Sequence, residues 1–435
     1  MAKLARTNLA RFMFVLFATS SSCNVLAHET MYTTLDLQFT HYDRDYTKPQ
    51  NDRVQTALSA ALAHSRSIAN DLIQIGGALY AVKEVSSSGR IVTDILALSD
   101  NELSGFALVG EAYVKFKPSE SLSFQIGRIE HKSLLLQSKT RAVASTFEGI
   151  GFDFSLNKYV QIYAHRFYRW SARASNKFAG FGTNVSEDNA IPYVEIIGLK
   201  FDNYDDKNWS ANANIEYLES KNYLRKLGLV TSVERSLKAS HKLELSGGIF
   251  FSRDAGELFT NGANDGLDYS TTPSDERQQH RGFGGYLALS YSQHNWSFGI
   301  TRSFIDDPWL EDSFADDHGT TPLPTKTYGP ELTNNNERIW KLEYTHNFAQ
   351  SWARGLRSKF SWARGAGAQN SIDAELGTGT ESWFELDLQY SPKVIDELQA
   401  RLRYRNYESD LTGQIAGIKD DRNELRFTIA YSIDF

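Results

Sequence analysis

The chain has 435 residues, with 46 basic and 53 acidic side chains and a net charge of −7. This acidic balance, without a basic tail, argues against nucleic acid as a partner, because binding to nucleic acid depends on cationic contacts with phosphates. Beyond the first 27 residues, no stretch approaches 18 consecutive apolar residues, so the sequence predicts no transmembrane helix.

Residues 1–27 have the pattern of a secretory signal peptide. Lys3, Arg6 and Arg11 precede the apolar residues 12–18, and Val-Leu-Ala at 25–27 fits a small-residue cleavage site. We therefore expect residues 1–27 to be removed and residues 28–435 to form the folded protein. An alternative treats Cys23 as a lipidated N-terminus, although the aliphatic residue usual three positions before it is missing.

Cleavage after residue 27 would leave a chain without cysteine, because Cys23 is the only one. Small secreted domains normally rely on disulfides, so a secreted chain without them needs another source of stability. A closed β-sheet can supply it. The composition, with 41% hydrophobic and 13% aromatic residues, also suits a transmembrane barrel, whose strands alternate lipid-facing and water-facing side chains.

Apolar and polar residues alternate with a period of two along most of the chain. The alternation is clear in residues 106–117, 208–217, 340–348 and 424–435. Such a period places the two kinds of side chain on opposite faces of an extended strand. Each run also has about the 9–11 residues that a tilted strand needs to cross a bilayer. Residues 54–63 are the one stretch that fits either a helix or a strand.

The sequence predicts eighteen strands, an even number as in single-chain bacterial barrels. Two of them, 121–130 and 222–234, alternate poorly. In chain order the predicted strands lie near 32–42, 54–64, 71–81, 105–117, 121–130, 149–156, 159–171, 193–201, 207–218, 222–234, 242–253, 281–293, 295–303, 338–348, 356–364, 382–391, 397–406 and 423–435.

The predicted connections sort into two kinds. Most short links alternate with long polar ones, which indicates turns at one end of a barrel and loops at the other. A β-sandwich with turns at regular spacing would not sort them in this way. The short links are 118–120, 157–158, 202–206, 293–294 and 392–396, and the long ones are 82–104, 131–148, 172–192, 254–280, 304–337, 365–381 and 407–422.

An arginine stripe, formed by Arg401, Arg403 and Arg405, lies on one face of the strand predicted at 397–406. A lipid-facing arginine costs ~2–4 kcal/mol at the bilayer midplane, so we expect the stripe to face a wet interior, with Leu402 and Tyr404 outward. Arg426, Arg357 and Lys359 fall on polar faces of neighbouring predicted strands and extend the charge.

Two interpretations of this charge stay open at the level of sequence. Glu385, Asp387 and Glu424 oppose the basic residues, so cross-strand salt bridges would stiffen the wall. Alternatively, the basic residues form a cationic track for solutes that bear carboxylates, because charged rings set selectivity and arginine presents a fork of donors matched to a carboxylate. Both can hold together.

Several segments resemble the OprD-type family of outer-membrane porins. The resemblance lies in residues 35–46 (LDLQFTHYDRDY), 124–154, 165–181, 385–409 and 423–435, in that order. Within 124–154 a Leu-rich run, Arg141 and Phe-Glu-Gly at 147–149 recur in the family's order. The resemblance implies a monomeric barrel of eighteen strands for small solutes, although a trimer stays possible.

The resemblance also implies roles for particular residues. The family's basic ladder maps onto Arg401, Arg403 and Arg426. Its inward-folded constriction loop maps onto residues 131–148, with the candidate residues Ser133, Lys139, Thr140, Arg141 and Phe147. The Arg-Leu-Leu-Pro run usual in that loop is here Arg-Ala-Val-Ala at 141–144, and Ile433 stands where an aromatic residue is usual.

No motif in the sequence indicates catalysis or a metal site. The ten histidines are scattered, and neither GxSxG nor HExxH occurs. Residues 305–317 (IDDPWLEDSFADD) place six carboxylates in one long loop, which is either a solvated loop or a site for cationic solutes, sugars or lipopolysaccharide bridged by divalent cations. The segment 261–268 lacks calcium-loop spacing and is expected to be a turn.

We therefore expect an all-β transmembrane antiparallel barrel with an inward-folded loop, located in the outer membrane. Its expected function is substrate-preferring diffusion of small hydrophilic, carboxylate-bearing solutes, without cofactor or catalysis. Expected partners are these solutes, outer-membrane lipids and lipopolysaccharide, and the barrel-insertion machinery through the C-terminal strand. The alternative is a barrel of another class, such as a hydrolase or a channel for polysaccharide export or chito-oligosaccharides.

Overall fold

The computed structural model describes thirteen segments of the chain. They are residues 30–182, 190–202, 208–238, 241–258, 279–291, 293–306, 323–325, 332, 334–349, 353–369, 377–395, 397–410 and 421–435. In these segments, no helix has the length and apolar character needed to cross a membrane.

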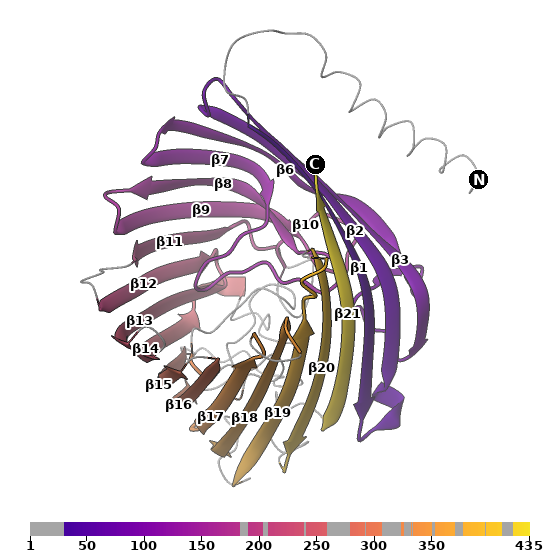
Figure 1. The fold of residues 1–435 in the computed structure, drawn as a ribbon, viewed down its shortest axis with the longest axis vertical. Helices are drawn as coiled ribbons and strands as arrows, with labels where there is room; N and C mark the ends of the chain where they lie inside the picture. Colours follow the sequence, from indigo (N-terminus) through magenta and orange to yellow (C-terminus); the bar gives the residue numbers. More distant parts are fainter. Residues whose placement is uncertain are drawn as a thin grey trace.

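Eighteen long strands of the described segments form one closed antiparallel sheet. Each long strand pairs with its neighbours in chain order, and Figure 1 shows them following one another around the wall. The barrel closes between its first and last strands, where Phe39 pairs with Ile429. The strands are β1 (Met31–Tyr46), β2 (Arg53–Ile68), β3 (Ile73–Gly89), β6 (Phe106–Ser119), β7 (Leu122–Ile129), β8 (Thr146–Ser155), β9 (Val160–Ser171), β11 (Val194–Phe201), β12 (Trp209–Ser220), β13 (Leu224–Lys238), β14 (His241–Asp254), β15 (Gln279–Tyr291), β16 (His294–Asp306), β17 (Arg338–Asn347), β18 (Leu356–Gln369), β19 (Thr378–Tyr390), β20 (Leu398–Ser409) and β21 (Arg422–Asp434).

The predicted strands are confirmed in number and order. The ambiguous segment at 54–63 lies within β2, and the two poorly alternating segments form β7 and β13. Several strands are longer than predicted. For example, β3 continues to Gly89, which is inside the expected loop 82–104. The shorter elements are η1 (Pro49–Asn51), β4 (Ala97–Ser99), β5 (Glu102–Ser104) and the two-residue β10 (Ala179–Gly180), which pairs with β9.

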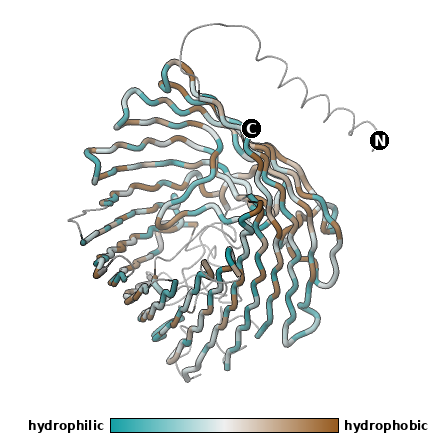
Figure 2. Tube along the Cα trace, in the orientation of Figure 1, coloured by the Kyte–Doolittle hydropathy of each residue, from teal (hydrophilic) through white to brown (hydrophobic). Residues whose placement is uncertain are grey.

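The two faces of the sheet differ in character, as the period of two requires. On β20, Leu402 and Tyr404 are 39% and 37% exposed on the outer face, whereas Arg403 and Arg405 are buried on the inner face. Figure 2 shows the same alternation of hydrophobic and hydrophilic residues along many strands. The apolar outer face is what a lipid-facing barrel requires.

The connections alternate in length, as predicted. Short turns such as 69–72, 120–121 and 156–159 lie at one end of the barrel, and the long segments 90–105 and 130–145 lie at the other. At the long-loop end the turn 221–223 is an exception, because it joins β12 to β13 with only three residues.

Two of the long loops fold against the inner face of the barrel. We call residues 90–105 loop A and residues 130–145 loop B. Loop A contains the β4–β5 hairpin, in which Ser99 pairs with Glu102. Asp100 and Asn101 between them both have positive φ, which is the geometry of a type I′ turn. This hairpin was not predicted from the sequence.

A buried apolar cluster holds the two loops against β1–β3 and β6. Ile95 and Leu96 of loop A and Val143 of loop B pack there with Tyr42 and Tyr80 of the wall. A second cluster lies on β8–β14, where Leu135 and Leu136 of loop B pack against wall side chains such as Phe167 and Leu218. Loop B therefore contacts two separate parts of the inner face.

Candidate functional site

The arginine stripe lies on the inner face of β20 and is paired with carboxylates of β19. Arg401 Nε donates to Asp387 Oδ1 at 2.8 Å, and Arg403 Nε lies 3.6 Å from Asp387 Oδ2. The antiparallel register explains the contact, because Arg403 is directly opposite Asp387. One carboxylate of β19 thus holds two neighbouring guanidinium groups.

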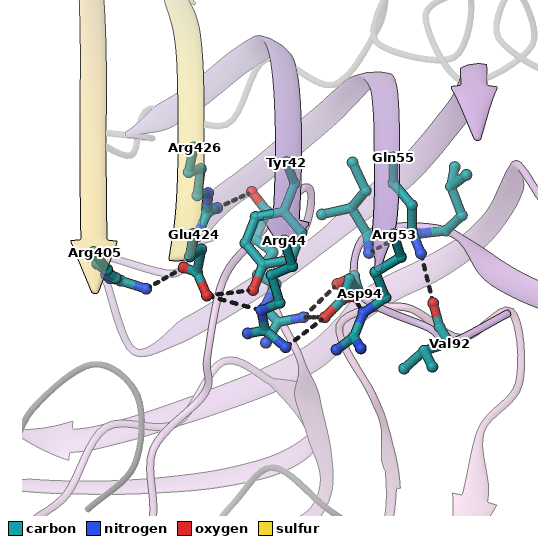
Figure 3. Close-up of polar contacts among 12 residues, drawn as sticks. Tyr42, Arg44, Arg53, Gln55, Val92, Asp94, Arg405, Glu424 and Arg426 are labelled. Carbon is teal, nitrogen blue, oxygen red and sulfur yellow. Dashed lines mark hydrogen bonds and ion pairs between the residues drawn. The ribbon is translucent and has the colours of Figure 1, made fainter. Parts of the chain in front are cut away.

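Arg405 connects β19 to β21 through two buried carboxylates. Its Nε donates to Glu385 Oε2 at 2.7 Å, and its Nη1 donates to Glu424 Oε1 at 2.5 Å. Glu424 also accepts from Tyr42 Oη at 2.8 Å and from Arg44 Nε at 2.9 Å (Figure 3). This network extends across the seam where β21 meets β1.

Asp94 of loop A collects three guanidinium groups. Arg53 Nε donates to its Oδ2 at 2.5 Å, Arg141 Nη1 donates to its Oδ1 at 2.6 Å, and Arg44 Nη1 lies 3.6 Å from Oδ1. Figure 3 shows Asp94 beside Arg44 and Arg53. Burial alone would raise the pKa of Asp94, but Arg44, Arg141 and Arg53 outweigh it and hold the pKa below the usual value for aspartate. Asp94 is therefore an ionised link between loop A, loop B and the wall.

Gln55 of β2 fixes the backbone of loop A. Its Nε2 donates to the Val92 carbonyl at 2.5 Å, and its Oε1 accepts from the backbone N–H groups of Ile95 at 2.9 Å and Leu96 at 3.2 Å. These bonds satisfy backbone groups that would otherwise be buried without partners.

The tip of loop B is held by its backbone carbonyls. The Arg141 carbonyl accepts from Gln38 Nε2 at 2.6 Å and from Arg426 Nη2 at 2.9 Å. The next carbonyl, of Ala142, accepts from Ser59 Oγ at 2.8 Å. The donors come from β1, β21 and β2, so three strands of the wall position Arg141.

The start of loop B is anchored on Glu216 of β12, a fully buried residue. Its carboxylate accepts from Ser133 Oγ at 2.9 Å, from Leu135 N–H at 2.7 Å and from Leu134 N–H at 3.1 Å. Tyr163 Oη is a fourth donor. Loop B therefore extends from β12 on one side of the barrel to β21, β1 and β2 on the other.

His131, near the start of loop B, is surrounded by aromatic rings. Its ring centroid lies 4.9 Å from that of His165 and 5.0 Å from that of Phe167. Burial, with a contribution from His165, lowers the pKa of His131 to about 3, so the ring is neutral at physiological pH. A neutral imidazole packs here as a hydrophobic residue.

We call ten basic side chains the cationic wall. Nine of them lie on the inner face of the strands, and the tenth, Arg141, lies in loop B. Within the described residues, the ion pairs of this wall join its cations to five carboxylates: Asp94, Glu343, Glu385, Asp387 and Glu424. The wall comprises Arg44, Arg53, Arg141, Lys341, Lys359, Arg401, Arg403, Arg405, Arg422 and Arg426. In these ion pairs eight cations share five carboxylates, and Glu381 is a further buried carboxylate on the inner face of β19.

The described residues contain no group of three side chains suited to hold a metal ion. What the arrangement offers chemically is a cationic surface with several guanidinium forks, in a barrel narrowed from within by two loops.

A family model for outer membrane porins of the OprD family matches residues 34–435. The chain belongs to this OprD porin family. No curated protein is similar enough in sequence to match the chain.

Solved structures of related porins have the same fold at low sequence identity. OccAB1 of Acinetobacter baumannii has a TM-score of 0.80 at 15% identity, covering 96% of this chain and 99% of that one. OccK9 (OpdG) of Pseudomonas aeruginosa has a TM-score of 0.78 at 17% identity, covering 93% and 98%. OpdK of Pseudomonas aeruginosa, solved with vanillate, has a TM-score of 0.77 at 16% identity, covering 93% and 99%. The family consists of channels for small solutes in the outer membrane, and the long loops of this porin therefore face the cell exterior.

Four further residues that were predicted for the site lie either on β18 or in loop B. Lys359 bridges Glu343 at 3.2 Å and Glu385 at 3.4 Å, and Arg357 is exposed on the same face, nearer the periplasmic turns. Lys139 N–H donates to Ser145 Oγ at 2.9 Å, and Thr140 forms a bridge with Ala144, so both shape the return of loop B.

Phe147, expected in the constriction loop, instead lies in β8. It is fully buried in the apolar cluster that supports loop B, and the segment expected to fold inward at 131–148 is shortened to residues 130–145. Phe147, Gly149 and Gly151 share one face of β8, so the alternation begins before residue 149, where the strand was predicted to start. The acidic loop after residue 306 and the segment 261–268 lie outside the described residues.

Three functional residues of the porin were not found from sequence. Asp94 stands in a segment without a motif, and its partners are 41 to 50 positions away. Glu216 lies in a regular alternating strand, where a polar residue on the inner face needs no explanation. Tyr42 bonds Glu424 across the barrel seam. The sequence offered one sign of the contacts with loop A. Arg53 and Gln55 are polar residues at the start of a strand that is otherwise rich in alanine and leucine.

Proposed function

We propose that this porin is a passive diffusion channel that favours small hydrophilic solutes bearing carboxylates, guided by the cationic wall. The observation that carries the proposal is the row of basic side chains on the described inner faces of β17, β18, β20, β21, β1 and β2, because in the ion pairs of the cationic wall eight cations share five carboxylates. Arginine matches a carboxylate with two parallel donors, and a charged lining lowers the barrier for solutes of opposite sign.

Different arginines of the stripe have different roles in this proposal. The Arg401 side chain is 35% exposed, whereas those of Arg403 and Arg405 are 8% and 7% exposed. We assign Arg401, with Arg357, Lys359 and Arg141, to contact with the solute. Arg403, Arg405 and Arg426 maintain the positive potential and hold the wall and loop B in place, so the salt-bridge and cationic-track interpretations apply together.

One solved structure with the same fold was determined with a carboxylate solute. OpdK was solved with vanillate, an aromatic carboxylate. The identity to OpdK is 16%, so the likeness concerns the fold, and a carboxylate preference in this chain rests on its own arginines.

The proposal includes the other expectations for this chain. Residues 1–27 are a signal peptide and residues 28–435 the barrel. The porin acts without catalysis or cofactor, as a monomer rather than a trimer. It contacts lipopolysaccharide, and its C-terminal strand, β21, with Phe435 directly after it, is recognised by the insertion machinery. A barrel hydrolase or an export channel is the competing function, and either would show little solute diffusion in liposomes.

Liposome swelling tests the proposal with vanillate, a dicarboxylate, arginine and a neutral disaccharide. We expect the wild type to pass the carboxylates faster than the disaccharide, and Arg401→Ala/Arg403→Ala to lose that preference several-fold. Arg235→Ala is the matched control, because Arg235 stacks over Trp209 on the outer face of β13. Equal selectivity in the wild type and the double variant would remove the carboxylate preference, and silent liposomes would remove the channel.

A further inference from the structure

Charged side chains gather on the outer face of the barrel toward the extracellular side of β7–β13; Arg166 lies five residues before the end of β9, opposite Glu195 near the start of β11. Five basic residues and three acidic residues form this group, which we call the rim cluster. Its members are Arg128, Arg166, Arg169, Lys221 and Arg225, with Glu148, Glu195 and Glu219. They do not belong to the cationic wall, which lies on the inner face.

The alternation of each strand places these charges on the lipid-facing side. Arg128 follows Phe124 and Ile126, which are 45% and 60% exposed, at intervals of two residues. Glu195 similarly precedes Ile197 and Leu199. A charge on this face is unfavourable in the hydrocarbon layer, so we expect these side chains to lie at the membrane surface, where they can contact polar groups.

The rim cluster lies at the level of the outer leaflet. Arg128 is next to the last residue of β7, Arg169 is two residues before the end of β9, and Arg225 is the second residue of β13. All three strand ends lead to or from the extracellular side. In the outer membrane, that leaflet carries lipopolysaccharide.

The cations of the rim cluster are oriented by neighbours and remain accessible. Arg166 Nη2 donates to Glu195 Oε2 at 2.6 Å and stacks over Tyr193, yet its side chain is 41% exposed. Arg169 lies 3.7 Å from Glu148 and is 47% exposed. Arg128 pairs with Glu148 at 2.5 Å. Five cations against three carboxylates leave a net positive surface.

An apolar groove in the outer wall ends at the rim cluster. It has a volume of about 430 Å³ and ends at Arg166 and Glu195. Most of its lining is apolar: Val114, Phe116, Phe124, Ile126, Ile150, Phe152 and Ala164. A groove of this kind accepts a hydrocarbon chain, while the arginines at its end suit a phosphate.

We propose that the rim cluster and this groove bind one lipopolysaccharide molecule. A phosphate of its lipid A contacts Arg166 and Arg169, and one acyl chain lies in the groove along Ile126 and Ile150. Charge complementarity and the position at the extracellular end select this lipid over the zwitterionic phospholipids of the inner leaflet. The inference assigns residues to the lipopolysaccharide contact proposed above, and it rests on outer-membrane location rather than on the solute preference of the pore.

Native mass spectrometry of the purified porin in detergent tests this site with lipid A and with lipid A lacking phosphates. We expect the wild type to bind phosphorylated lipid A about tenfold or more tightly than the dephosphorylated form, since bonds to charged groups are lost. Arg166→Gln/Arg169→Gln should remove that difference, whereas Arg235→Gln, an outward arginine at the periplasmic end of β13, should preserve it.

A second variant tests the groove. Ile150→Trp fills it and should weaken binding of both lipid forms, with liposome swelling unchanged because Ile150 faces outward. Equal binding of the two lipid forms by the wild type would overturn the proposal, even if the arginine variant failed to fold. Undiminished lipid A binding by folded Arg166→Gln/Arg169→Gln would also overturn it.

Discussion

The carboxylate of Asp94 in loop A accepts a hydrogen bond of 2.6 Å from the guanidinium of Arg141 in loop B. Arg53 and Arg44 of the wall contact the same carboxylate. The two inward loops are therefore joined to each other and to the barrel through one buried anion. We expect the shape of the narrow part of the pore to depend on this contact.

Asp94→Asn should loosen both loops. Removing one partner from a buried group of ion pairs costs ~3–5 kcal/mol, because the charges left behind lose their compensation. We expect more frequent conductance fluctuations and a changed mean conductance in planar bilayers. Asp100→Asn is the matched control, since Asp100 is exposed in the β4–β5 turn and asparagine tolerates its positive φ of 52°. Identical single-channel records for the two variants would contradict the role of Asp94.

The Asp94 contact should persist in mild acid. The neighbouring guanidinium groups hold its pKa below the unfolded value of about 3.9, so its ionised form stabilises the docked loops at all pH values above that unfolded value. That stabilisation is lost only as the pH falls through the lower pKa of the folded state. Hydrogen exchange at residues 92–97, corrected for intrinsic rates, should thus be constant from pH 7 to 4. A rise in exchange near pH 6 that Asp94→Asn abolishes would refute this.

His131 should make the start of loop B sensitive to acid in a different range. Burial lowers its pKa to about 3, whereas a released loop would take up a proton below about pH 6.5. The docked state therefore weakens by up to about 1.4 kcal/mol per pH unit between those values. We expect exchange at residues 131–138 to rise as the pH falls from 7 to 4, and His131→Phe to flatten this response. A pH response unchanged by His131→Phe would show that another group is responsible.

Glu216→Ala should release the start of loop B from β12. The carboxylate accepts from two backbone N–H groups and two hydroxyls, and its removal leaves these buried donors without their acceptor, at ~1–3 kcal/mol for each. The amides of Leu134 and Leu135 should then exchange much faster. Glu219→Ala, on the outer face of the same strand, serves as the control. If both amides stayed protected in Glu216→Ala, the apolar packing of Leu135 would be the main anchor.

The sequence was sufficient to predict the wall of this porin. Alternation with a period of two is a local property, and it located even β7 and β13, where it is weak. The inner position of the arginine stripe followed from the cost of placing Arg401 and its neighbours in lipid. Its cross-strand partners Glu385, Asp387 and Glu424 followed from the strand order.

The interior could not be predicted in the same way. Asp94, Glu216 and the carbonyl of Arg141 act through contacts between residues that are far apart in the chain, and no periodicity marks them. Phe147 was placed in a loop because the predicted strand began at residue 149, whereas β8 begins at Thr146. The β4–β5 hairpin is stabilised by packing of Ile95 and Leu96 on the wall, which the loop sequence alone does not specify.

The most direct test of the cationic wall is the reversal potential of single pores in a KCl gradient. We expect wild type to prefer anions, Arg401→Ala to shift the potential toward cations, and Asp387→Asn, which removes the carboxylate beside Arg401, to shift it further toward anions. Opposite shifts of the reversal potential in Arg401→Ala and Asp387→Asn would show that both charges act on the permeating ions. Reversal potentials unchanged in both variants would contradict a cationic wall that faces the permeating solute.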